Sequence, residues 1–238
     1  MDRTASAYYT QGMSLACLAL LASLSAPPAA AAAAAPPARL AYADGDVTIQ
    51  SKDGGRLGRT GAALADGEAV VTGPGATAIV ETADGSRLKL RESSRLVLNL
   101  PAVRRPETEV ELSWGGVFAK VTKRRLGEQF RVRTQTAVAA VRGTQFFTAY
   151  GRDAGKTKDL WVCVNEGAVD VKTDGAKEGL LVPAGKGVLV KAGTELTQPQ
   201  AYDWTKLLNW NMDAKTGGVE DRTDLESAYT ELIDQDYR

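Results

Sequence analysis

Residues 130–150 read FRVRTQTAVAAVRGTQFFTAY, and this stretch carries the strongest indication of the fold. Its first six residues alternate between apolar or small side chains and polar ones, which is typical of a half-buried β-strand. The alternation changes phase between Val138 and Val141, and the tripeptide RGT at 142–144 follows. One extra residue in a β-bulge produces such a shift. We therefore expect a bend at this tripeptide.

The tripeptide Arg142-Gly143-Thr144 has two interpretations, of which we prefer a structural motif. Gly143 supplies the backbone freedom that a bend requires. The bend would turn Arg142 inward, where its guanidinium could reach a carboxylate such as Glu166 or the carbonyls of the bend. In the alternative interpretation the tripeptide contacts a ligand or partner.

The rest of the segment from Arg39 to about Thr197 consists of short strand-like runs separated by glycine. These runs are rich in Val, Leu, Thr and aromatic residues. The tripeptide Ala-Asp-Gly recurs at 43–45, 65–67 and 83–85, and Asp-Gly pairs favour tight turns. The pattern predicts an all-β domain over residues 39–198, built as a wrapped β-sandwich or a short, irregular β-solenoid.

The pattern changes after Pro199, and residues 199–238 predict a C-terminal helical extension. Two apolar stripes at helical spacing predict two α-helices. The first stripe is Trp204, Leu207, Leu208 and Met212, and the second is Leu225, Ala228, Tyr229, Leu232 and Ile233. We expect these helices to pack on the β-domain, with Trp204 docked, or on a partner. The acidic last helix could alternatively dock against the basic residues between Lys120 and Arg142.

Residues 1–38 predict a signal peptide followed by an Ala/Pro-rich leader. Residues 4–38 contain no charged side chain, and the apolar run MSLACLALLASL is short and precedes prolines. This pattern is more typical of a cleaved secretory signal than of a membrane span. We expect an exported protein of the bacterial envelope, periplasmic or extracellular, without a stable membrane span after cleavage. Cys163, in the apolar run LWVCV, is then a core residue more than a reactive thiol.

Composition argues against most enzyme classes. The chain has 29 basic and 29 acidic residues and no histidine, which excludes nucleophile systems and metal sites that depend on histidine. Phosphate-binding loops, nucleophile elbows and cysteine pairs for zinc are absent from the sequence. We predict a protein that is not an enzyme, with no cofactor, no metal site and no catalytic residue.

Several segments in order resemble the FecR domain family. They are DGDVTI, LADGEAVVTGPGATAIVETADGSRLKL, LSWGGVFAKV, the stretch at 130–150 with its VRGT, and WVCVNEGAVDV. The resemblance covers residues 44–191 and implies the FecR fold, an exported location and a role in protein contact. Members that regulate sigma factors carry an N-terminal helical domain and a membrane span. The predicted leader takes that place here, so the resemblance is to a stand-alone FecR-like protein.

The sequence offers two functional hypotheses. The first is a protein-interaction or sensing module in the cell envelope, whose partner could be a receptor or a membrane regulator. The second is a binding module for an anionic envelope polysaccharide or surface. Its candidate residues lie in the basic segment between Lys120 and Arg142 and are Arg124, Arg125, Arg131 and Arg133. An exported location makes nucleic acid an unlikely partner for these residues.

Overall fold

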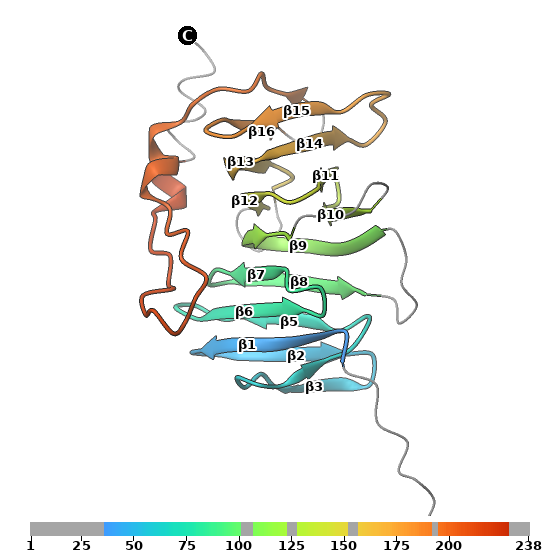
Figure 1. The fold of residues 1–238 in the computed structure, drawn as a ribbon, viewed down its shortest axis with the longest axis vertical. Coiled ribbons are helices and arrows are strands. Elements are labelled where there is room, and N and C mark those ends of the chain that lie inside the picture. Colours follow the sequence, from blue (N-terminus) through green and yellow to red (C-terminus); the bar gives the residue numbers. More distant parts are fainter. Residues whose placement is uncertain (1–35, 101–106, 123–127, 152–156, 192–194, 229–238) are drawn as a thin grey trace, which may run out of the picture. The chain divides into compact units, whose positions relative to one another are not determined.

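The fold is all-β and consists of two sheets that share one long strand (Figure 1). The structure is a computed structural model that describes residues 36–100, 107–122, 128–151, 157–191 and 195–228. Sheet A has the order β4 (Ala63–Leu64), β1 (Ala38–Asp44), β6 (Thr77–Thr82), β7 (Arg87–Leu90), β9 (Glu107–Lys120), β12 (Gln145–Tyr150), β13 (Leu160–Glu166), β16 (Gly187–Lys191) and β17 (Glu195–Leu196). Sheet B has the order β3 (Gly54–Leu57), β2 (Val47–Ser51), β5 (Ala69–Thr72), β8 (Ser94–Asn99), β9, β10 (Gln129–Arg133), β11 (Ala137–Val141), β14 (Ala168–Thr173) and β15 (Leu180–Pro183).

Strand β9 joins the two sheets because it bends in its middle. Its first half pairs with β8 and β10 in sheet B, and its second half pairs with β7 and β12 in sheet A. The bend lies at Gly115, whose φ of 92° is in the region that favours glycine. A Cβ atom at Gly115 would also lie 2.5 Å from the Cα atom of Ser94. Both the backbone conformation and the close approach of Ser94 therefore require glycine at this position.

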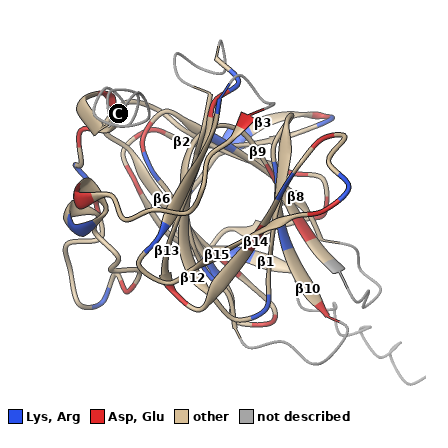
Figure 2. Cartoon of the chain, turned by 90° about the horizontal axis from the view of Figure 1, so that it is seen from above, with Lys and Arg blue, Asp and Glu red and all other residues tan. Residues whose placement is uncertain are grey.

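The main core fills the space between the two sheets (Figure 2). Side chains on alternate positions of most strands face it, such as Leu96 and Leu98 of β8 and Val188 and Val190 of β16. All four are at most 2% exposed. Burial of apolar surface on this scale is the main source of stability in a sandwich. The prediction of a wrapped all-β domain is confirmed.

The stretch at 130–150 is a hairpin followed by a change of sheet. Strands β10 and β11 pair in sheet B, with Phe130 opposite Val141, and the chain then crosses to β12 in sheet A. The expected bend is present at 142–144, and Gly143 has a φ of 93°. The buried positions change phase twice: at the turn between β10 and β11, and again where the chain crosses to β12 in the opposite sheet. A register shift does occur just beyond, between Gln145 and Phe146.

The C-terminal segment lies along the outer face of sheet A, which confirms that it packs on the β-domain (Figure 1). We call residues 199–228 the strap. The prediction of the first α-helix is wrong. In the part of the strap that contains the first stripe, the chain forms a 3-10 helix, η1 (Asp203–Leu207), and then runs irregularly. Side chains of Asn209 and Asn211 bond to nearby backbone groups there, which competes with helix formation. Residues 225–228 are helical, and residues 229–238 lie outside the described residues.

Two other sequence predictions concern regions that the structure does not describe. The predicted leader, residues 1–38, lies almost entirely outside the described residues, as do Arg124 and Arg125. Within the described ranges, the structure contains no helix that combines the length and the hydropathy needed to span a membrane.

Candidate functional site

The outer face of sheet A carries an aromatic surface that the strap covers. Strands β9, β12, β13 and β16 contribute Phe118, Phe147, Trp161, Cys163 and Leu189. Their neighbours in sequence face the main core, so the run LWVCV is apolar throughout because both of its faces are buried. The strap packs Tyr202, Trp204, Leu208, Met212 and Ala228 against this surface. These residues form a second hydrophobic cluster, separate from the core between the sheets.

Ring contacts join the strap to the sheet. Trp210 meets the ring of Phe118 edge-on at 5.3 Å between centroids, and Trp204 lies 5.2 Å from Trp161. Phe118 also contacts Phe147 at 4.6 Å. Such pairs add stabilisation beyond the area they bury. The predicted docking of Trp204 is therefore confirmed.

Lys89, a basic residue of β7, binds the strap through hydrogen bonds to the backbone of the strap. Lys89 is 1% exposed, and its Nζ donates hydrogen bonds to the carbonyl oxygens of Asn209 and Asn211, the latter at 2.8 Å. The ammonium also lies 4.3 Å from the centroid of the Phe118 ring. Burial lowers the pKa of Lys89 to about 8, with Asp221 acting in the opposite direction. The lowered pKa means that removal of the Lys89 side chain from water disfavours its charged form.

Arg91 follows β7 and meets the buried acid of the strap, Asp221. The Arg91 Nε atom lies 3.4 Å from Oδ1 of Asp221, and Nη2 donates to the Thr223 carbonyl at 2.7 Å. The Asp221 side chain is completely buried and accepts hydrogen bonds from the backbone N–H groups of Asn209 and Thr223. Burial lowers the pKa of Arg91, and Asp221 opposes that shift. We call Lys89, Arg91 and Asp221 the latch.

Polar contacts outside the latch also bind the strap to sheet A. Arg87 donates to the carbonyl of Met212, and Gln145 donates to the carbonyl of Trp210 at 3.1 Å. Gly187 and Gln200 exchange two backbone hydrogen bonds of 2.8 and 3.0 Å, the single β-bridge outside the named strands in the described part of the chain. Side chains of the sheet thus bind the strap mainly through its backbone carbonyls, independently of the strap's own side chains.

The outer face of sheet B carries the described part of the proposed basic site. Arg133 donates to Glu109 of β9 at 2.9 Å, and Arg131 donates to Gln129. Parallel pairing places Glu109 and Glu111 of β9 beside Arg131 and Arg133 of β10. The bond to Glu109 raises the pKa of Arg133. Acids and bases alternate on this face, so its described residues do not form a basic patch.

The bend at 142–144 has a structural role in the described contacts. Thr144 is buried, donates its hydroxyl to the Ala168 carbonyl at 3.0 Å and accepts the N–H of Val121. The expectation that Arg142 turns inward is wrong, because its side chain is exposed. The positive φ of Gly143 lets the chain turn from β11 in sheet B to β12 in sheet A, and Arg142 is exposed at this turn. A binding role for Arg142 stays a prediction.

The sequence reasoning did not identify the latch. In SRLKLRE, Arg87, Lys89 and Arg91 alternate with leucines, which predicts a charged row on one face of a strand. Such a row is usually exposed, and only the fold shows that the strap covers it. The local sequence around Asp221 does not indicate an ion pair, because its basic partner, Arg91, lies more than a hundred positions away.

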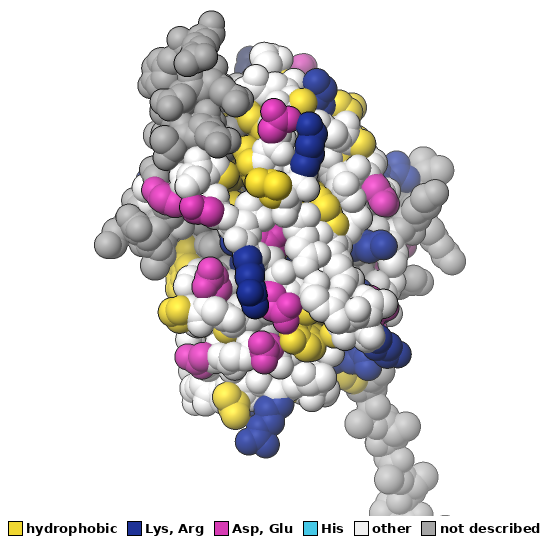
Figure 3. Space-filling view, turned by 90° about the vertical axis from the view of Figure 1, so that its left-hand side faces the viewer, with side chains coloured by type: hydrophobic (Ala, Val, Ile, Leu, Met, Phe, Trp, Pro, Cys, Tyr) yellow, Lys and Arg dark blue, Asp and Glu magenta, His cyan; other side chains and the backbone are white. Residues whose placement is uncertain are grey.

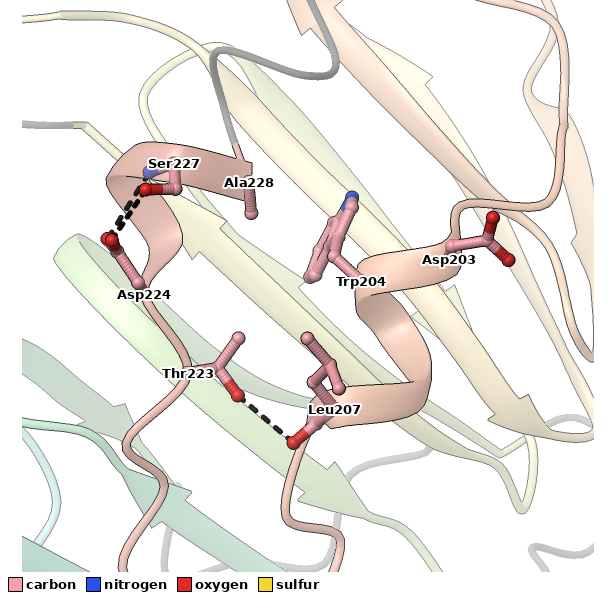
Figure 4. Close-up of a pocket in the computed structure, with 7 residues that line it drawn as sticks. All are labelled: Asp203, Trp204, Leu207, Thr223, Asp224, Ser227 and Ala228. Atoms are coloured by element: carbon pink, nitrogen blue, oxygen red, sulfur yellow. Dashed lines mark hydrogen bonds between the residues drawn. The ribbon is translucent and has the colours of Figure 1, made fainter.

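The strap also contains a cavity of about 400 Å³, lined by Asp203, Trp204, Leu207, Thr223, Asp224, Ser227 and Ala228 (Figure 4). Ser227 donates to Asp224 within a local turn, and Thr223 donates to the Leu207 carbonyl and so joins two parts of the strap. Trp204 Nε1 is buried without a hydrogen-bond partner. The described lining contains no nucleophile paired with a base. Cys163 is buried beneath the strap, and burial raises the pKa of its thiol.

Comparison with known proteins finds similarity to one protein family and to two solved structures. Residues 68–170 match the family model described as FecR protein. Two crystal structures of candidate anti-sigma factors from Parabacteroides distasonis ATCC 8503 are similar in fold, with TM-scores of 0.50 and 0.51 and identities of 18% and 19%. The alignments cover 58% and 69% of this chain, and 63% and 72% of those chains, so the chain matches less than two thirds of the first structure's length. No curated protein matches the sequence. Residues 68–170 of the chain are thus similar to the FecR protein family, and the fold is similar to that of the two crystal structures.

Proposed function

We propose that the protein is a non-catalytic regulatory module that acts in the cell envelope by binding another protein. The FecR domain and the fold shared with candidate anti-sigma factors support a role in signalling through protein contact. The charge-free segment at residues 4–38 supports export. An outer-membrane receptor or a membrane-anchored regulator is the kind of partner that the FecR resemblance implies.

One observation carries the proposal: sheet A holds a segment of irregular chain on its outer face. Lys89, Arg91 and Gln145 donate to four backbone carbonyls of the strap, and aromatic side chains fill the space between. Contacts to backbone supply affinity without demanding a particular sequence, and apolar pockets supply selectivity. The fold therefore already binds a peptide segment, here one of its own.

The second hypothesis, binding to an anionic polysaccharide through the basic segment, gains no support from the described face of sheet B. Arg133 is paired with Glu109, and Glu111 lies on the strand beside it. Negatively charged glycan chains would meet these acids as well as the arginines. Arg124 and Arg125 lie outside the described residues, so their contribution to such binding stays a prediction.

Crosslinking in isolated envelopes tests the proposed function. The full chain carries a C-terminal tag, is crosslinked in isolated envelopes, and is recovered under denaturing conditions for mass spectrometry. We expect one envelope protein to be enriched over an unrelated exported protein with the same tag. Recovery of cell-wall material alone, released by salt and lost when Arg131 and Arg133 are reversed in charge, would support the polysaccharide hypothesis instead. Enrichment of nothing above the control would contradict both.

A further inference from the structure

The strap and the sandwich are held by separate sets of contacts. The main core between the sheets contains no residue of the strap, and the strap cluster contains no inward-facing residue of sheet B. One β-bridge, Gly187 with Gln200, connects the strap to the ladder of sheet A. Loss of the strap would therefore leave the core and the strand pairing in place.

The interface beneath the strap has buried groups that oppose its closure. Lys89 and Arg91 are charged and are 1% and 8% exposed, with Asp221 as the one buried acid beside them in the described residues. Two buried cations against one acid leave a net charge in a site removed from water, which is costly. The Nε atoms of Arg91 and Trp204 are buried without hydrogen-bond partners.

The outer side of the strap does not resemble a protein core. Figure 3 looks onto this side, where acidic and basic side chains are interspersed with scattered apolar ones. Leu207 is 73% exposed, although it lies in η1 beside the buried Trp204. The strap is thus a single layer on sheet A, open to solvent on its other side.

We propose that the strap is a displaceable cover, and that its release exposes a docking face for an extended segment of a partner protein. The inference rests on the proposed function and identifies the surface that the partner uses. The uncovered face presents Phe118, Phe147 and Trp161 beside the cations Lys89 and Arg91. It fits a segment with the chemistry of the strap itself: aromatic side chains, free backbone carbonyls and one carboxylate.

Cys163 reports on the position of the strap. It lies in the cluster beneath the strap, with its thiol on the outer face of β13, so labelling by a thiol reagent requires the strap to move or the protein to unfold. The first experiment measures labelling of Cys163 against urea concentration in the full chain, with Cys17→Ser as background. A displaceable strap predicts labelling at low urea with a much weaker urea dependence than global unfolding. Labelling that follows global unfolding at every urea concentration would overturn the proposal.

The second experiment removes the acid of the latch. Asp221→Asn leaves Lys89 and Arg91 buried without a counter-charge, so we expect Cys163 to label roughly 100-fold faster. The circular dichroism of the sheets should not change. Asp203→Asn is the matched control, because it removes an acid of the same strap whose side chain is 92% exposed, and its labelling rate should match the wild type. Equal rates for the two variants would contradict the latch.

The docking face is tested with a synthetic peptide of residues 199–228 that carries a fluorophore. The peptide should bind the Asp221→Asn protein saturably and the wild-type protein at least about tenfold more weakly, since the wild-type face is occupied. Absence of binding to the variant, or equal binding to both proteins, would contradict the docking face. None of these three experiments needs the natural partner. Their failure therefore overturns the displaceable strap, whereas failed capture in envelopes overturns the proposed function.

Discussion

Substitution of Gly115 by alanine tests how β9 serves both sheets. Gly115 has a φ of 92°, and an added Cβ would meet the Oγ, Cβ and Cα atoms of Ser94, with Cα and Cβ at 2.5 Å. Ser94 cannot move away easily, because its Oγ accepts the N–H of Gly116 at 2.9 Å within the buried junction. The substitution therefore imposes both backbone strain and a steric clash.

The expected loss of stability follows from these two effects. A side chain in a left-handed backbone conformation costs about 1–2 kcal/mol. Overpacking against a fixed neighbour costs about 1–3 kcal/mol more. Gly115→Ala should thus lower the free energy of unfolding by about 2–5 kcal/mol. Gly75→Ala is the control, because Gly75 has a φ of 67° with nothing within 4 Å of an added Cβ, and it should lose only about 1 kcal/mol.

Urea denaturation, followed by far-ultraviolet circular dichroism, measures both variants. The reasoning predicts a clearly lower midpoint for Gly115→Ala than for Gly75→Ala, with similar slopes. Equal midpoints would show that backbone conformation alone matters at Gly115. A loss below about 1 kcal/mol for Gly115→Ala would refute the constrained junction between the sheets.

Three further predictions concern the strap and the outer face of sheet B. The pKa of Lys89 is about 8 in the folded protein and 10.5 as its ordinary value, so the folded form gains stability as pH rises through this window. Urea titration should therefore show that the wild-type free energy of unfolding rises by roughly 2 kcal/mol from pH 8 to pH 10, relative to that of a Lys89→Met variant. The same pH dependence in both proteins would contradict the buried ammonium. The raised pKa of Cys163 acts in the opposite direction above its ordinary value of 9.0, but it is common to both proteins and cancels. Trp204→Ala should weaken closure of the strap by about 3 kcal/mol and speed thiol labelling roughly 100-fold, and an unchanged rate would show that the indole does not hold the strap. A double-mutant cycle on Glu109 and Arg133 should give a coupling of at most about 1 kcal/mol that falls with salt, and a larger, salt-independent value would contradict an exposed pair.

The sequence predicts the β-domain well because its information is local. Alternation in many strands and glycine at many turns indicate the all-β fold, and Gly143 has the positive φ that a bend requires. The phase does not change within β11, where Ala137, Ala139 and Val141 are buried and Val138 faces outward, but it changes at the turns on either side of this strand. A bulge and a change of sheet both invert the direction of side chains, and only the pairing of β10 with β11 distinguishes them.

The candidate site was harder to predict because it depends on contacts between distant residues. Arg133 belongs to a basic segment in sequence, yet its neighbour in space is Glu109 on the adjacent parallel strand. Trp204, Leu208 and Met212 of the predicted stripe do pack on sheet A, but Leu207 is exposed. The stripe lies on a 3-10 helix and irregular chain, because the outer face of sheet A determines where those side chains pack. The partner of Lys89, the backbone of residues 209–211, leaves no trace in composition or periodicity.

Partner capture with an opened strap tests the central claim most directly. The tagged wild type, Asp221→Asn and Asp203→Asn proteins are crosslinked in parallel in isolated envelopes, and the enriched protein is quantified by mass spectrometry. If sheet A is the docking face and the strap covers it, Asp221→Asn should capture the same protein as the wild type with a several-fold higher yield, and Asp203→Asn should match the wild type. Equal or lower capture by Asp221→Asn would contradict the account, because an uncovered docking face cannot bind its partner less well than a covered one.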